Sequence, residues 1–97
     1  MEESEIVRRM LAVLNSMDEV YALRTHGGSF QQKGTPDILG CAHGRFFAIE
    51  AKRSAREKPS AAQIYNLNKF IGAGGQTFVS FDPKAQEVIA WIVGLKN

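Results

Sequence analysis

Two short apolar runs joined by a His-Gly turn are the feature that most constrains the fold of this chain. They lie between Gly34 and Lys52, on either side of His43-Gly44. Apolar runs separated by such a turn are typical of a β-hairpin. We therefore predict a β-hairpin in this segment. Cys41, on the first of its strands, is expected to be a small buried hydrophobe.

Three ionisable residues lie near the open end of the predicted hairpin. Asp37 is at the start of the first strand, and Glu50 and Lys52 are near the end of the second. Side chains alternate between the two faces of a strand, so Glu50 and Lys52 project from the same side. Bare charges are unfavourable inside a strand unless something pairs with them. Two carboxylates and an ammonium on one sheet face therefore predict a site for a divalent cation beside a phosphate.

Each of these residues also has an ordinary structural interpretation. Asp37 follows Pro36, which fixes the backbone, and an aspartate in this place is common in turns. Glu50 and Lys52 would be a solvent-facing pair on a strand. The chemical interpretation depends on all three residues acting together.

The segments before the hairpin predict a helix, a strand and a loop. Residues 4–16 carry apolar side chains at helical spacing, and residues 20–24 are rich in β-formers. Residues 25–34 are polar and contain two adjacent glycines, which favours a loop.

A second helix is expected after the hairpin, beginning at the capping box Ser60-Ala61-Ala62-Gln63 and ending at the glycines of residues 72–75. It would bury four apolar residues: Ile64, Leu67, Phe70 and Ile71. Residues 77–81 predict a further strand with Phe78, and as a second candidate Val79, in the core.

The last segment, residues 83–95, has two interpretations. Asp82-Pro83 is typical of a helix start, and the apolar residues that follow keep helical spacing. Residues 88–93 are also rich in β-branched side chains, which would suit a strand after a turn. We favour the helix. The order is then helix, strand, strand, strand, helix, strand, helix, and it predicts an α/β fold with a mixed central sheet flanked by helices.

Length and composition limit the class of protein. The 97 residues predict one domain covering residues 1–97. No apolar run approaches the roughly 20 residues of a membrane-spanning helix, so we expect no membrane partner. A single cysteine excludes an internal disulfide and suits a reducing cytoplasm. The sequence contains no Walker-type phosphate loop, and no nucleotide cofactor is expected.

Positive charge is concentrated around the predicted acidic site. Residues 24–58 contain seven basic and three acidic residues, although the whole chain has a net charge of only +2. Such a surround suits a site that attracts a polyanion while it holds a cation. The candidates for phosphate contact are Lys33, Arg53, Arg56 and Lys58. The simpler alternative is that some of these are solvated surface charges.

The residues of the hairpin also carry a family resemblance. Pro36-Asp37 followed by Glu50-Ala51-Lys52 resembles the signature of PD-(D/E)XK nucleases. The wider pattern is similar to the small VRR-NUC branch: an acidic first helix, Lys33-Gly34-Thr35-Pro36-Asp37, Gly44-Arg45-Phe46, Glu50-Ala51-Lys52, Gln63 and a later Gly-Gly. This resemblance covers most of the chain and implies a restriction-endonuclease-like core.

The resemblance implies a metal-dependent endonuclease that hydrolyses DNA phosphodiester bonds, with Mg²⁺ as cofactor and Mn²⁺ able to replace it. Asp37, Glu50 and the backbone carbonyl of Ala51 would bind the metal, and Lys52 would hold or polarise the attacking water. Two nearby carboxylates favour the charged ammonium. We therefore expect Lys52 to orient the attacking water and neutralise negative charge, rather than to act as a general base.

In this family the first helix adds a further acid to the site. Glu3 shares a helical stripe with apolar residues that would face the sheet, so we assign it the catalytic role, with Glu5 as the alternative. Gln63 resembles the family's glutamine, and we expect it to contact the nucleic-acid backbone or a metal-bound water. Its other interpretation, the closing of the capping box, stays open.

Stand-alone members of the family resemble Holliday-junction resolvases. This implies DNA as partner, a preference for branched or four-way-junction DNA, a homodimer, and the cytoplasm of a bacterium or a phage-infected host cell. The alternative is a non-catalytic nucleic-acid-binding module with a nuclease-like fold. Metal-dependent cleavage would distinguish the two.

Overall fold

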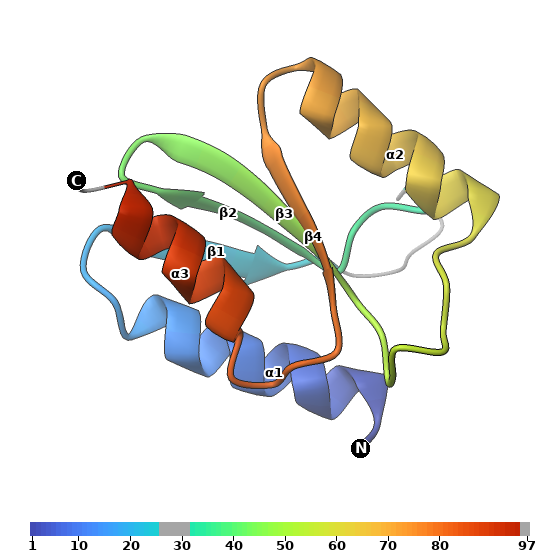
Figure 1. Cartoon of the computed structure of the whole chain (residues 1–97), viewed down its shortest axis with the longest axis horizontal. Helices are drawn as coiled ribbons and strands as arrows, with labels where there is room; N and C mark the ends of the chain where they lie inside the picture. Colours follow the sequence, from blue (N-terminus) through green and yellow to red (C-terminus); the bar gives the residue numbers. More distant parts are fainter. Residues whose placement is uncertain (26–31, 96–97) are drawn as a thin grey trace.

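The fold was determined from a computed structural model, which describes residues 1–25 and 32–95 (Figure 1). The elements are α1 (Glu3–Asn15), β1 (Val20–Arg24), β2 (Ile38–Ala42), β3 (Arg45–Ala51), α2 (Ala61–Gly72), β4 (Gln76–Ser80) and α3 (Gln86–Gly94). This is the predicted α/β order. Of the loop expected at residues 25–34, residues 26–31 lie outside the described residues.

A four-stranded mixed sheet forms the centre of the molecule, with strands in the order β1-β2-β3-β4. The hairpin of β2 and β3 turns at His43-Gly44, where φ is +49° and +80°. Two consecutive positive φ values are required by the tight turns that match the twist of a hairpin. β1 pairs antiparallel with β2, whereas β4 pairs parallel with β3 after the crossover through α2.

One face of the sheet lies under α1 and α3 and carries the core (Figure 1). The helical stripe of α1 buries Ile6, Val7, Met10 and Leu14 against it, as its spacing predicted. At the centre of this face, Phe47 is fully buried and its ring packs edge-on against Trp91, 5.9 Å between centroids. We refer to this as the core face.

The opposite face lies partly under α2, and we refer to it as the α2 face. Here the Phe46 and Phe70 rings stack with centroids 5.0 Å apart, and Leu67 is buried. Three apolar residues predicted to be buried are instead exposed: Ile64 by 46%, Ile71 by 53% and Val79 by 44%.

Cys41 also differs from its prediction, because it is exposed. In the sheet register it pairs with Tyr21 on one side and Phe46 on the other, which places it on the α2 face. Alternation identified the two faces of the hairpin correctly, but α2 packs over β3 and β4 and leaves β1 and β2 uncovered here.

The last segment is a helix, as favoured, but it starts later than Asp82-Pro83 predicted. α3 begins at Gln86, after Ala85 with φ of +50°. The Asp82 carboxylate accepts hydrogen bonds from the backbone N–H groups of Lys84 (2.9 Å) and Gln86 (3.0 Å). Asp82 therefore stabilises a turn that precedes the helix. In the part of the chain that the structure describes, no helix is long and apolar enough to cross a membrane.

Candidate metal centre

Three carboxylates from three separate segments meet at the end of the sheet where β3 finishes. Glu3 lies at the start of α1, Asp37 directly precedes β2, and Glu50 is near the end of β3. Each offers one oxygen, and these atoms all lie within 4.8 Å of one another. Carboxylate oxygens at this separation are suited to a hard divalent cation such as Mg²⁺.

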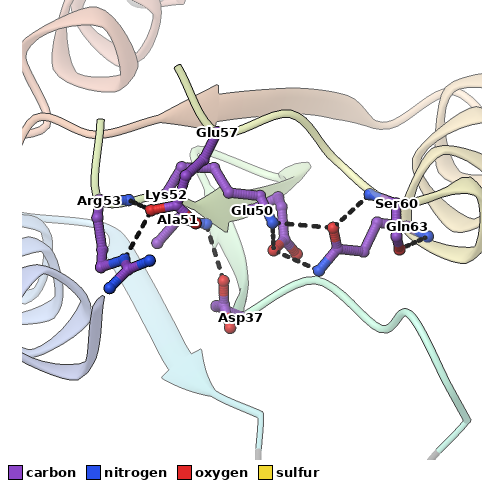
Figure 2. A network of polar contacts seen from close by, with 8 residues as sticks. All are labelled: Asp37, Glu50, Ala51, Lys52, Arg53, Glu57, Ser60 and Gln63. Atoms are coloured by element: carbon purple, nitrogen blue, oxygen red, sulfur yellow. Dashed lines mark hydrogen bonds and ion pairs between the residues drawn. The ribbon is translucent and has the colours of Figure 1, made fainter. Parts of the chain in front are cut away.

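Asp37 is fixed by the hairpin itself. The last backbone pair of β2 and β3 is Ile38 with Ile49. Beyond it, Asp37 Oδ2 accepts a hydrogen bond of 2.8 Å from the backbone N–H of Ala51 (Figure 2). The Asp37 side chain therefore extends the hydrogen bonding between the two strands past their last backbone pair. The backbone N–H of Thr25 donates to the Asp37 carbonyl at 2.9 Å. The bond to Ala51 uses one of the two carboxylate oxygens.

The segment leading to Asp37 is held against the start of α2. Gly34 has a φ of +84°, and a Cβ there would meet the Ala62 backbone at 2.6 Å. The Asn66 side chain donates to the Lys33 carbonyl at 3.1 Å. A glycine is required at position 34 both for its conformation and for this close approach.

Glu50 is the most buried of the three acids, with 1% of its surface exposed. Its Oε2 accepts a hydrogen bond of 2.8 Å from Gln63 Nε2 and lies 3.2 Å from Lys52 Nζ. Its Oε1 is buried and has no hydrogen-bond partner among the described residues. A buried acceptor without a partner costs about 1–3 kcal/mol, and a cation at the carboxylate cluster would satisfy it.

Burial and repulsion between acids change the ionisation of the cluster. Burial, and secondly the Asp37 carboxylate, raise the pKa of Glu50 to about 7, although Lys52 acts in the opposite direction. Burial and Asp37 likewise raise the pKa of Glu3. A cation bound between these groups would favour their charged forms.

The structure places Glu3, and not Glu5, at the cluster. Glu5 instead accepts hydrogen bonds from Arg8 at 2.6 and 3.0 Å on the exposed side of α1, and this pairing lowers the pKa of Glu5. Helix phase is what separates the two residues, because Glu3 continues the stripe that faces the sheet.

Lys52 and Gln63 form a bridge between the cluster and α2 (Figure 2). Lys52 is 8% exposed, and its Nζ donates to Gln63 Oε1 at 2.9 Å. The same oxygen accepts the backbone N–H of Ser60 at 2.8 Å, while Ser60 Oγ accepts from the Gln63 N–H at 3.2 Å. The predicted capping box is therefore present.

The contacts of Gln63 with Glu50 and Lys52 were missed by sequence reasoning. A signal existed, because a polar side chain at the third residue of a helix that begins soon after the strand can reach back to it. The capping box alone had offered a complete explanation for this glutamine.

The four basic residues predicted to contact phosphate are exposed, and none of them is part of the carboxylate cluster. Arg53 Nε is paired with Glu57 at 2.7 Å, and Lys58 Nζ lies 3.5 Å from the Ala55 carbonyl. Arg56 and Lys33 lie on exposed turns, Arg56 in the connection from β3 to α2 and Lys33 in the segment that leads to Asp37. Their contact with nucleic acid, and the metal contact of the Ala51 carbonyl, stay predictions.

The chain was compared with protein families, curated proteins and solved structures. No family profile and no curated protein matches it. A solved VRR_NUC domain superposes with a TM-score of 0.73 at 18% identity, covering 92% of this chain and 94% of that chain. A VRR_NUC domain protein gives 0.75 at 16% identity, covering 98% and 90%.

A third similar structure is Hjc, a Holliday junction resolvase from the archaeal hyperthermophile Archaeoglobus fulgidus. It superposes with a TM-score of 0.60 at 24% identity and covers 78% of this chain and 64% of that chain. At these identities the likeness is one of fold. The restriction-endonuclease-like core predicted from the sequence is therefore confirmed, and the chain has the fold of VRR_NUC domain proteins over nearly its full length.

Proposed function

We propose that this protein is a metal-dependent endonuclease that hydrolyses phosphodiester bonds in DNA. The observation that carries the proposal is the convergence of Glu3, Asp37 and Glu50 at one point, with Glu50 Oε1 buried and without a partner. Lys52 lies beside it with its ammonium held by two acceptors. Acids that serve only the fold have no need to meet in this way.

The cation would be Mg²⁺, with Mn²⁺ able to replace it, held by the three carboxylates and the Ala51 carbonyl. When bound, such a cation supplies an activated water and neutralises charge on the phosphate. Glu50 must lose its proton to serve as a ligand. Because its pKa without metal is about 7, metal affinity should increase as the pH rises through that value.

Lys52 would position the attacking water and neutralise the charge that develops on phosphate oxygens. Gln63 Oε1 at 2.9 Å and Glu50 Oε2 at 3.2 Å fix its ammonium in place. A preorganised charge in a site that excludes water stabilises a transition state far better than one on a mobile surface side chain.

The DNA backbone would contact Lys33, Arg53, Arg56 and Lys58, all of which are exposed. Fold similarity to a Holliday junction resolvase supports branched or four-way-junction DNA as substrate. A homodimer would supply the second site that paired cuts require. The proposed reaction involves no nucleotide cofactor and no membrane.

The experiment is incubation with linear duplex, single-stranded, flap and four-way-junction DNA in Mg²⁺, Mn²⁺ or chelator. We expect cleavage with either metal, strongest on branched DNA, and none in chelator. Glu50→Gln and Lys52→Ala should each reduce cleavage by about 10³-fold or more, equivalent to about 4 kcal/mol of transition-state stabilisation.

Arg45→Ala is the matched control, because this exposed basic residue lies at the opposite end of β3. It should cut at the rate of the unchanged protein. Cleavage that persists in chelator, or in both site variants, would contradict the proposal. Binding of DNA without cleavage under every metal condition would instead favour a non-catalytic binding module.

A further inference from the structure

A cavity of about 300 Å³ lies directly beside the proposed catalytic lysine. It is open to solvent and is lined by the connection from β3 to α2 and by the end of edge strand β4. Its walls include Ala55, Pro59, Val79 and Phe81, and they are mainly apolar. Phe81 and Val79 are 51% and 44% exposed, so two large apolar side chains face water here.

Lys52 is shared by this cavity and the carboxylate cluster. Its Nζ contacts Glu50 and Gln63, while the residue also lines the cavity. A DNA strand whose scissile phosphate lies at the cluster therefore has its neighbouring nucleoside within reach of the cavity. The group most directly available to fill it is covalently attached to the reacting phosphate.

We propose that this cavity receives the unstacked nucleobase of a nucleotide next to the scissile phosphate, with the base packed against Phe81. The inference rests on the proposed function, and it adds a substrate contact that the cluster alone does not provide. Aromatic side chains bind bases through their faces with little regard to sequence. A volume of about 300 Å³ is at the small end of ligand pockets, which suits one base and excludes a stacked pair.

The charges of the walls support a nucleotide as the occupant. Lys58 lines the cavity and Arg56 is exposed on the same connection, while Glu57, the one acid in the lining, is paired with Arg53 at 2.7 Å. An apolar floor with basic side chains on the neighbouring connection matches a flat base that carries phosphates on either side. An apolar side chain of a second protein copy would have no use for these charges.

The cavity also gives a physical reason for selecting branched DNA. A base inside a duplex must leave its stack and its partner before it enters, at a cost of a few kcal/mol. This cost is least where a base is already unpaired or poorly stacked, as beside a flap or at a junction. Selection by shape would then arise at the cut site itself.

The test combines Phe81→Ala with substrates that lack one base. The cut position is first mapped on the preferred branched DNA. Affinity is then measured in chelator by fluorescence anisotropy, with a single abasic site moved through the nucleotides next to that position. For the unchanged protein, one such position should weaken binding by about tenfold or more.

Phe81→Ala should weaken binding to intact DNA by a similar factor, and the abasic site should then cause little further loss. Phe81→Trp should restore binding, because it keeps a stacking face. Tyr21→Ala is the control: this aromatic is 66% exposed on the other edge strand, and its removal should leave the abasic effect unchanged.

Two outcomes separate the inference from the proposed function. In the first, DNA is cut normally, but the losses of affinity caused by Phe81→Ala and by the abasic site are independent of each other or are both absent. The base site is then wrong, while the proposed nuclease function stands. If no DNA is cut with either metal, the proposed function is overturned and the base site with it.

Discussion

The core face of the sheet buries its side chains almost completely, whereas the α2 face leaves many of its own in water. On the first, Phe47 and Ile49 have no exposed surface. On the second, Tyr21 and Leu23 are 66% and 53% exposed, although they stand on a strand of the same sheet. The two faces differ because two helices cover the core face and α2 covers only part of the other.

This difference shows how a short chain divides its surface between stability and function. The core face supplies the apolar burial that offsets chain entropy. The α2 face is left to hold Lys52 and Gln63 and to leave the cavity beside them accessible. The carboxylates meet where the faces join, since Glu3 comes from a helix of the core face.

The largest expected effect follows from this asymmetry. Phe47→Ala should lower the free energy of unfolding by about 3–5 kcal/mol, because a fully buried ring is replaced by a cavity. The matched change on the α2 face, Phe70→Ala, should cost about 1 kcal/mol, mainly its stacking with Phe46. Urea denaturation measures both. Equal losses in the free energy of unfolding would show that the two faces contribute equally to stability.

The next effect concerns Glu50, one of the three carboxylates that meet where the two faces join. The pKa of Glu50 is about 7 in the folded protein and 4.5 in an ordinary carboxyl, so the folded state binds its proton more tightly. Without metal, Glu50 should therefore favour folding below about pH 4.5. This contribution should fall by at most about 3 kcal/mol as the pH rises through 7.

Glu50→Gln should remove that part of the pH dependence and raise the melting temperature of the metal-free protein at pH 8. Thermal denaturation in chelator at several pH values checks this. Added Mn²⁺ should stabilise the unchanged protein and not the variant. An unchanged pH dependence in Glu50→Gln would mean that Glu50 is not the group that titrates.

A smaller pair of effects separates the two roles of Gln63. Ser60→Ala removes the side-chain half of the capping box and should cost about 1 kcal/mol of stability, with little change in cleavage. Gln63→Ala should cost a similar amount of stability. It should also slow cleavage by tenfold or more, because Lys52 and Glu50 each lose a hydrogen bond. Similar cleavage rates in Ser60→Ala and Gln63→Ala would show that Gln63 serves only to cap the start of α2.

The smallest effect is expected on the outer side of α2. Ile71→Gln should change stability by less than about 0.5 kcal/mol, since the side chain is 53% exposed. Ile92→Gln, at a fully buried position of α3, is the contrasting control and should be strongly destabilising. A loss above about 1 kcal/mol at Ile71 that depends on protein concentration would show that a second copy covers α2.

The fold was predictable because local patterns agreed with one another. Helical spacing defined α1, and His43-Gly44 fixed the turn of the hairpin. The errors in predicted burial have one physical cause. Periodicity identifies which residues share a face, but it does not say whether another element covers that face, and Cys41, Ile64 and Val79 were misplaced for this reason.

The grouping of site residues was partly predictable, for a different reason. Glu50 is near the end of β3, Lys52 follows directly after that strand, and Asp37 is across the hairpin from them, so short-range geometry suffices. The bond from the Ala51 N–H to Asp37 depends on the strand register at the hairpin end. The link of Gln63 to Glu50 depends on where α2 returns over the sheet, which local sequence does not encode.

The bond between Asp37 and the Ala51 N–H has a consequence for how such proteins diverge. Since the Asp37 side chain accepts the hydrogen bond that follows the last backbone pair of the hairpin, we expect an acceptor at position 37 to be favoured for the fold even where no cation binds. Glu50 is buried with one oxygen that has no hydrogen-bond partner among the described residues, so it destabilises the fold when no cation is bound. In a related protein that binds no cation, we expect Glu50 to be the first of the three acids to be replaced and position 37 to keep an aspartate or asparagine longest.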